Sequence, residues 1–157
     1  MYIYPQLIII TSNLTNIMDA NYQQFLKEIK GFMKESCIYT DELRTLAWGT
    51  DASFYRYIPQ IVLRSQDEEE LSRIVKTAHK YKLPFTFRAA GTSLSGQTVS
   101  DSILIVAGKN WEKYKVADDH ETIRLQPGIV GGRVNEILKP FGRVFPQIGR
   151  ASCRERV

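Results

Sequence analysis

Residues 87–97 read FRAAGTSLSGQ, a run in which small and hydroxyl-bearing side chains replace bulky ones. Gly91 and Gly96 tolerate backbone angles that are closed to other residues, so successive N–H groups can converge on an anion. Arg88 places a fixed cation at the entrance of the run. The hydroxyl donors of the run are Thr92, Ser93 and Ser95. We interpret the run as a cradle for a diphosphate, with an ordinary Gly- and Ser-rich turn as the alternative.

Two common nucleotide-binding motifs do not match this run. A P-loop carries Lys and then Ser or Thr after its last Gly, whereas Gln97 and Thr98 follow Gly96 here. The dinucleotide fingerprint G-x-G-x-x-G needs a third Gly and a closer spacing than that of Gly91 and Gly96. The diphosphate hypothesis therefore requires a different class of phosphate loop.

The elements around the run are expected to place it at the edge of a sheet. Residues 61–63 and 83–87 read as strands, and the helical spacing between them follows a Ser-x-x-Glu capping box at Ser65 and Glu68. A strand–helix–strand unit is normally a parallel crossover, so the run should lie at the carboxyl edge of the sheet. Ligands bind at that edge in folds of this class.

Periodic segments predict further elements on both sides of this unit. Residues 22–34 have the spacing of an amphipathic helix, and Thr40 is the predicted N-cap of a short helix that runs towards Trp48. Residues 49–59 read as a loop without a clear period. In that loop Asp51, Tyr55 and Tyr57 have no assigned role. The remaining predicted elements are a strand at 102–107, a hairpin at 115–117 and 122–125, a turn at Pro127-Gly128 and a helix beginning near Gly132.

The composition favours one folded domain and argues against several classes of partner. Of 157 residues, 43% are hydrophobic, and the net charge of +4 is spread along the chain. We therefore expect no nucleic-acid partner, and the apolar runs are too short for a membrane span. Cys37 and Cys153 fit a reducing compartment and have no metal-ligand spacing. His79 and His120 stand alone, so we expect surface histidines and no metal site.

The segments PQIVLRSQDEEELSRIVKTAHKYKLPFTFRAAGTSLSGQTVSDSILI and IRLQPGIVGGRVNEILKPFGRVFP resemble FAD-binding domains of the vanillyl-alcohol oxidase type, also called PCMH type. Within that group, the sequence is most similar to the FAD-linked D-lactate dehydrogenase and glycolate oxidase subunit family. The resemblance implies an α+β fold, namely the N-terminal part of a PCMH-type domain. This part would consist of a small parallel strand–helix–strand subdomain and the start of a mixed sheet.

The resemblance also implies a cofactor site. FAD would bind non-covalently, because the run contains no His or Cys for covalent attachment, and mainly through backbone amides. Ala89 and Ala90 stand where the family often has Gly, so their φ angles should be negative. The implied cofactor-binding residues are Arg88, Ala89, Ala90, Gly91, Thr92, Ser93, Ser95, Gly96, Pro127 and Gly128.

The activity implied by the resemblance is oxidation of a small 2-hydroxy acid of the D-lactate or glycolate type by an FAD-dependent oxidoreductase. The electron acceptor is unknown, no catalytic residue is assigned, and iron–sulfur clusters would belong to a later part of the protein. The alternatives are a flavoenzyme resembling UDP-N-acetylenolpyruvoylglucosamine reductase and a non-catalytic nucleotide-binding module. We expect a cytoplasmic location and leave open peripheral contact with the inner face of the membrane.

The two ends of the chain carry separate expectations. Residues 1–41 read as an N-terminal extension and helix, and the sequence leaves open two starts: Met1, or Met18 with residues 1–17 as a misassigned start. Residues 42–146 read as the truncated FAD-binding domain. Residues 147–157 resemble a translated sequencing adapter, and we expect a non-native tail there, with a natural basic tail as the alternative. Such a fragment should be inactive alone and bind FAD weakly or not at all.

Overall fold

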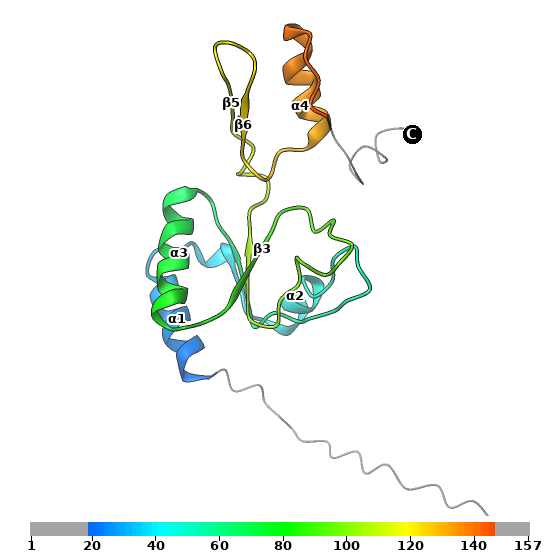
Figure 1. Ribbon diagram of the computed structural model, residues 1–157. Helices are drawn as coiled ribbons and strands as arrows, with labels where there is room; N and C mark the ends of the chain where they lie inside the picture. The colour runs from blue at the N-terminus through cyan, green and yellow to red at the C-terminus, as the bar shows by residue number, and fades with distance from the viewer. Residues whose placement is uncertain (1–18, 147–157) are drawn as a thin grey trace, which may run out of the picture.

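The computed structural model describes residues 19–146, so the predictions for the start of the chain and for the tail at 147–157 lie outside the described residues. Figure 1 shows a four-stranded sheet with α1 and α3 on one face and α2 on the other. A second part, made of a β-hairpin and α4, lies beyond the carboxyl ends of the parallel strands. The arrangement is the mixed helix-and-strand fold that the sequence predicts.

The sheet contains three parallel strands and one antiparallel edge strand. Its strands are β1 (Ile38–Tyr39), β2 (Ile61–Arg64), β3 (Phe85–Arg88) and β4 (Ile103–Val106). Their order is β1-β2-β4-β3, so β4 lies between the two strands of the predicted strand–helix–strand unit. The parallel pairing predicted for that unit is confirmed, because β2 and β3 both run parallel to β4. All four residues of β4 are buried.

The helices are α1 (Ala20–Lys30), α2 (Glu42–Ala47), α3 (Glu68–Lys80) and α4 (Gly131–Leu138). The hairpin pairs β5 (Tyr114–Val116) with β6 (Ile123–Leu125), as predicted. Short 3₁₀ turns at Glu35–Cys37 and Lys139–Phe141 and the edge strand β1 were not predicted.

Both predicted N-caps are wrong by one or two residues. The side chain of Asp41, not Thr40, accepts a hydrogen bond from the N–H of Arg44 at the start of α2. At the start of α3, Asp67 accepts from the N–H of Glu70, while Ser65 is buried. In both cases the aspartate directly before the first helical residue takes the cap, because its side chain is placed to reach an N–H group of the first turn.

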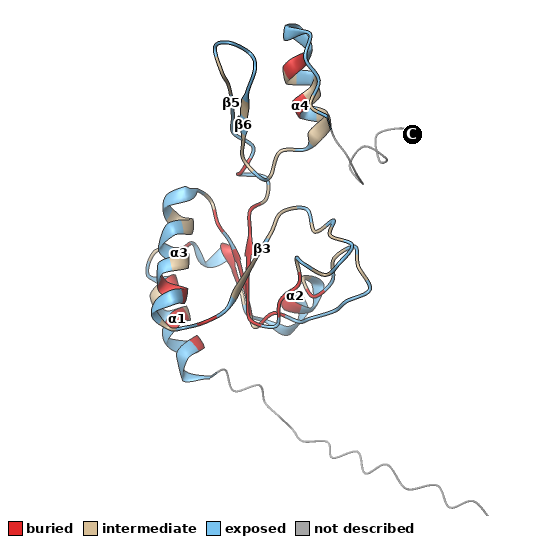
Figure 2. Cartoon of the chain, in the orientation of Figure 1, coloured by how far each residue is buried: buried red, intermediate tan, exposed pale blue. Residues whose placement is uncertain are grey.

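Two apolar layers hold the sheet, as the buried residues in Figure 2 show. On one face, α1 and α3 pack on side chains of β2 and β4, with Phe25 and Ile74 fully buried among them. On the other face, Val62, Leu104 and Val106 form a smaller cluster against Trp48. The helix α1 thus shares the core of the sheet, although it lies in the N-terminal segment.

Candidate functional site

The Gly-rich loop, residues 89–102, connects the carboxyl end of β3 to β4. The N–H of Ala107, which directly follows β4, donates to the carbonyl oxygen of Arg88 at 2.8 Å. The loop therefore begins beside the carboxyl end of the central strand, where β2 also ends. This confirms the predicted position at the carboxyl edge of the parallel strands (Figure 1).

The backbone of the loop has the conformation expected from its sequence. Gly91 and Gly96 have positive φ angles of 68° and 71°. The positive-φ residues other than glycine in the described range are Lys82 and His120. Ala89 and Ala90 are not among them, which confirms the prediction for these two residues.

The first half of the loop has backbone donors without partners. No N–H group of residues 89–94 donates a hydrogen bond within the part of the chain that the structure describes. In the second half, the Ser93 hydroxyl oxygen accepts from the N–H groups of Ser95 and Gln97 at 3.2 and 3.1 Å. Partly exposed loop amides without partners are the donors that an anion site requires.

The side chain of Arg88 is held within the protein. Its Nη1 donates to the carbonyl oxygens of Trp48 and Thr50 at 3.2 and 2.7 Å, and its Cζ lies 5.1 Å from the Trp48 ring centroid. Its Nε is buried and has no partner among the described residues. Burial lowers the pKa of Arg88, and the nearby carboxylate of Asp51 opposes that shift. Contact of Arg88 with a ligand remains a prediction.

Residues 48–57, which we call the clasp segment, contact the Gly-rich loop at several points. The N–H of Ala52 donates to the carbonyl oxygen of Gly91 at 3.1 Å. A Cβ added to Gly96 would lie 2.7 Å from Cδ2 of Tyr55, so the aromatic ring occupies that space. The clasp segment thus packs along the loop that the sequence identified.

Asp51 joins the clasp segment to the far end of the loop. One carboxylate oxygen accepts from the N–H of Ser53 at 2.8 Å, and the other accepts from the hydroxyl of Thr98 at 2.9 Å. Burial raises the pKa of Asp51, but hydrogen bonds from the hydroxyl and the N–H of Ser53 and from Thr98 outweigh it and hold the pKa below its ordinary value. The sequence analysis assigned no role to Asp51. An Asp two residues before a Ser signals a local turn but does not reveal a partner 47 residues away.

The Pro127-Gly128 turn reaches the same edge of the sheet by a different route. The N–H of Gly128 donates to the carbonyl oxygen of Trp111 at 2.8 Å, in the connection that follows β4. The indole N–H of Trp111 donates in turn to the carbonyl oxygen of Ser65 at 2.9 Å, just after β2. The structure therefore brings both predicted parts of the site to the carboxyl ends of the parallel strands.

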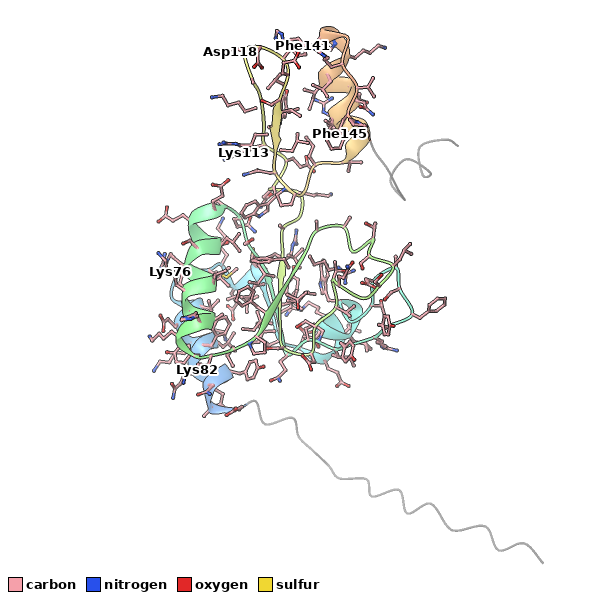
Figure 3. The ribbon with its side chains drawn as sticks, viewed as in Figure 1. Lys76, Lys82, Lys113, Asp118, Phe141 and Phe145 are labelled. Atoms are coloured by element: carbon pink, nitrogen blue, oxygen red, sulfur yellow. The ribbon has the colours of Figure 1, made fainter. Side chains whose placement is uncertain are left out.

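A cavity of about 370 Å³ lies elsewhere, between the hairpin and α4. Its lining residues are Tyr114, Val116, Arg133, Glu136, Ile137, Pro140 and Phe141. None of the predicted cofactor-binding residues is among them. At the hairpin tip, which Figure 3 marks with Asp118, the exposed His120 stacks on Phe141 with ring centroids 4.2 Å apart.

Residues 19–146 contain neither a membrane-spanning helix nor a cluster of metal-ligating side chains. No helix between residues 19 and 146 has the length and apolar character needed to cross a membrane. The same residues contain no group of three or more His, Cys, Asp or Glu side chains arranged to hold a metal ion. His79 and His120 are both exposed, as predicted.

The sequence is similar to an FAD-binding family and to known dehydrogenases. A family described as FAD binding domain matches residues 59–153. The D-2-hydroxyglutarate dehydrogenase of Haemophilus influenzae is 30% identical over 115 residues, which cover 71% of this chain and 11% of that protein. The mitochondrial D-lactate dehydrogenase (cytochrome) of Arabidopsis thaliana is 29% identical over 139 residues, which cover 83% of this chain and 24% of that protein. The chain thus spans a quarter or less of the length of these relatives.

A solved structure shows the same fold. The structure of p-cresol methylhydroxylase with substrate bound matches with a TM-score of 0.63 at 12% identity. The match covers 79% of this chain and 25% of that chain. This likeness confirms the predicted PCMH-type fold.

Proposed function

The chain belongs to the FAD binding domain family, and from this we propose that it supplies the diphosphate-binding part of an FAD-dependent oxidoreductase that oxidises a 2-hydroxy acid. The observation that carries the proposal is the row of N–H groups at residues 89–94 without partners within the described chain. These donors lie at the carboxyl edge of parallel strands, where ligands bind in such folds.

The residues present fit a diphosphate group. The backbone of Gly91 is in the left-handed region, which lets neighbouring amides turn towards a common point. An N–H donor gains strength when its acceptor is charged, as a diphosphate oxygen is. In this proposal the loop holds FAD through Ala89, Ala90, Gly91, Thr92, Ser93, Ser95 and Gly96.

The other predicted residues have supporting roles in the proposal. Arg88 contributes positive charge beneath the loop while its Nη1 stays bound to two carbonyl oxygens. Pro127 and Gly128 hold the connection after β4 in place beside the loop. FAD itself supplies the redox chemistry, and the chain binds and orients it. We assign no catalytic residue to the described chain.

The proposed substrate is a small 2-hydroxy acid, because two relatives are named for D-2-hydroxyglutarate and D-lactate. The substrates that we would test first are these two acids and glycolate. FAD is proposed to be non-covalent, since residues 87–97 contain no His or Cys. We propose a cytoplasmic location and leave the electron acceptor open.

The test uses the full-length protein that contains this chain. Purified protein should carry flavin absorbance, which should bleach when a D-2-hydroxy acid is added without oxygen. Acid precipitation should release the flavin into the supernatant, as expected for non-covalent binding. Protein that takes up FAD but is not reduced by any 2-hydroxy acid would contradict the proposed substrate class. Protein that takes up no FAD would contradict the whole proposal.

A further inference from the structure

The Gly-rich loop lacks internal backbone hydrogen bonds in its first half, so something outside it must set its shape. The N–H of Ala52, in the clasp segment, donates a hydrogen bond to the first half of the loop, at the carbonyl oxygen of Gly91, over 3.1 Å. Arg88 anchors the start of the loop to the carbonyl oxygens of Trp48 and Thr50. The shape of residues 89–92 therefore depends on the clasp segment.

The hydrogen bond from Ala52 also fixes the direction of the next amide. In a planar trans peptide, the carbonyl oxygen of one residue and the N–H of the following residue point to opposite sides. Because the oxygen of Gly91 points towards the clasp segment, the N–H of Thr92 points away from it. One contact thus aims a donor at the open side of the loop.

Asp51 holds this contact in place from both sides. Its carboxylate accepts from the N–H of Ser53, which closes a turn with Ala52 at its centre. The same carboxylate accepts from the hydroxyl of Thr98, at the other end of the Gly-rich loop. Ala52 is therefore fixed in conformation and is also fixed relative to the loop.

We propose that Asp51 is a positioning residue for the diphosphate site: it ties the clasp segment to the Gly-rich loop and so directs the loop amides. This inference rests on the proposed function, because it assigns those amides to the diphosphate of FAD. Asp51 itself touches no ligand in this proposal. The nearby guanidinium of Arg88 opposes the negative charge of Asp51.

A purely structural role for Asp51 makes a different prediction from a positioning role. If Asp51 had only a structural role, its substitution would lower the stability of the fold and weaken the binding of every ligand to a similar extent. If Asp51 is a positioning residue, its substitution would weaken the binding of ligands that carry the diphosphate and leave the affinity for other ligands unchanged. FAD and ADP carry the diphosphate, whereas riboflavin carries the flavin ring without it.

The experiment compares Asp51→Asn, Thr98→Val and the double variant in the full-length apoprotein. Thr98→Val removes the hydrogen bond between the two side chains, whereas Asp51→Asn removes the negative charge from it, since an amide can still pair with a hydroxyl group. Loss of one charge-assisted hydrogen bond should lower the affinity for FAD and for ADP by about tenfold. The double variant should bind FAD no more weakly than Asp51→Asn does. The affinity for riboflavin should stay unchanged in all three variants.

Asp41→Asn is the matched control, because Asp41 is another carboxylate that accepts from a backbone N–H, in an exposed position at the start of α2. It should lower stability slightly and leave FAD affinity unchanged. Unchanged FAD and ADP affinity in Asp51→Asn, with normal binding by the wild type, would overturn the positioning role alone. Equal weakening of riboflavin would also overturn it. A wild-type protein that binds no FAD would overturn the proposed function and this inference together.

Discussion

Gly128 lies so close to Gly108 that a Cβ added to Gly128 would be 2.2 Å from the carbonyl oxygen of Gly108. The contact is between two backbone segments, so neither side can relieve it by changing a rotamer. It joins the turn after β6 to the connection that follows β4, the central strand of the sheet. The Pro-Gly turn predicted from sequence therefore has a packing reason for its glycine.

Gly128→Ala should destabilise the protein by about 1–3 kcal/mol, the usual cost of forcing an extra carbon into a packed site. Urea unfolding would measure the loss. Gly108→Ala is the control, because its added Cβ would meet only a Val106 side-chain carbon at 3.9 Å. Equal stability of the two variants would show that the backbones are not in the close contact described.

Gly91→Ala should cost about 1–2 kcal/mol in stability, because alanine resists the left-handed conformation at φ 68°. Its Cβ would also meet the Arg88 guanidinium, 2.4 Å from Nη2. Gly142→Ala has a similar φ of 64° and no atom within 4 Å of the added Cβ, so it isolates the conformational cost. We expect both variants to lose stability in thermal unfolding and only Gly91→Ala to lose FAD affinity. A loss of FAD affinity in Gly142→Ala as well would contradict the assignment to the loop.

The stability contributed by Asp51 should depend on pH. Burial raises the pKa of Asp51, but hydrogen bonds from Ser53 and Thr98 lower it by more than burial raises it. The folded pKa therefore lies below the unfolded value of about 3.9. A group with a lowered folded pKa stabilises the fold above its unfolded pKa and loses that effect as the pH falls through the folded one. The difference in unfolding free energy between wild type and Asp51→Asn should be constant near neutral pH. It should shrink as the pH falls below about 4. A difference that stays constant down to acid pH would contradict the prediction.

Phe25→Ala should lower the free energy of unfolding by about 3–5 kcal/mol, because the side chain of Phe25, on α1, is fully buried in the core that α3 and the strands share. This tests whether the N-terminal helix belongs to the same folded unit as the FAD-binding residues. Leu43→Ala is the control, since that side chain is 77% exposed and should change little. Cooperative unfolding with unchanged stability in Phe25→Ala would show that α1 is not part of this core.

Sequence patterns were sufficient where a local rule decides the structure. The apolar runs of β2, β3 and β4 and the helical spacing of α3 predicted the parallel unit, and the position of the Gly-rich loop followed from it. The two N-caps were wrong because Asp41 and Asp67, which are equally suited to the cap, directly precede the first helical residues. A choice between adjacent capping residues depends on where the chain turns, which periodicity does not resolve.

The partners of the loop could not be predicted for a different reason. Asp51 and Thr98 are 47 residues apart, and nothing local marks either as the other's partner. Arg88 is predicted as a fixed cation at the loop entrance, but the sequence does not show that its Nη1 donates to the carbonyl oxygens of Trp48 and Thr50. Both contacts depend on the packing of the clasp segment against the sheet, which is a tertiary property.

The most direct test of the diphosphate site is hydrogen exchange in residues 88–98 of the full-length apoprotein, with and without FAD. The amides of residues 89–94 have no partner in the described chain, so they should exchange rapidly without the cofactor. Saturating FAD should slow their exchange strongly, ADP should do the same, and riboflavin should not. FAD binding that leaves the exchange of these amides unchanged would contradict the assignment of the loop to the diphosphate.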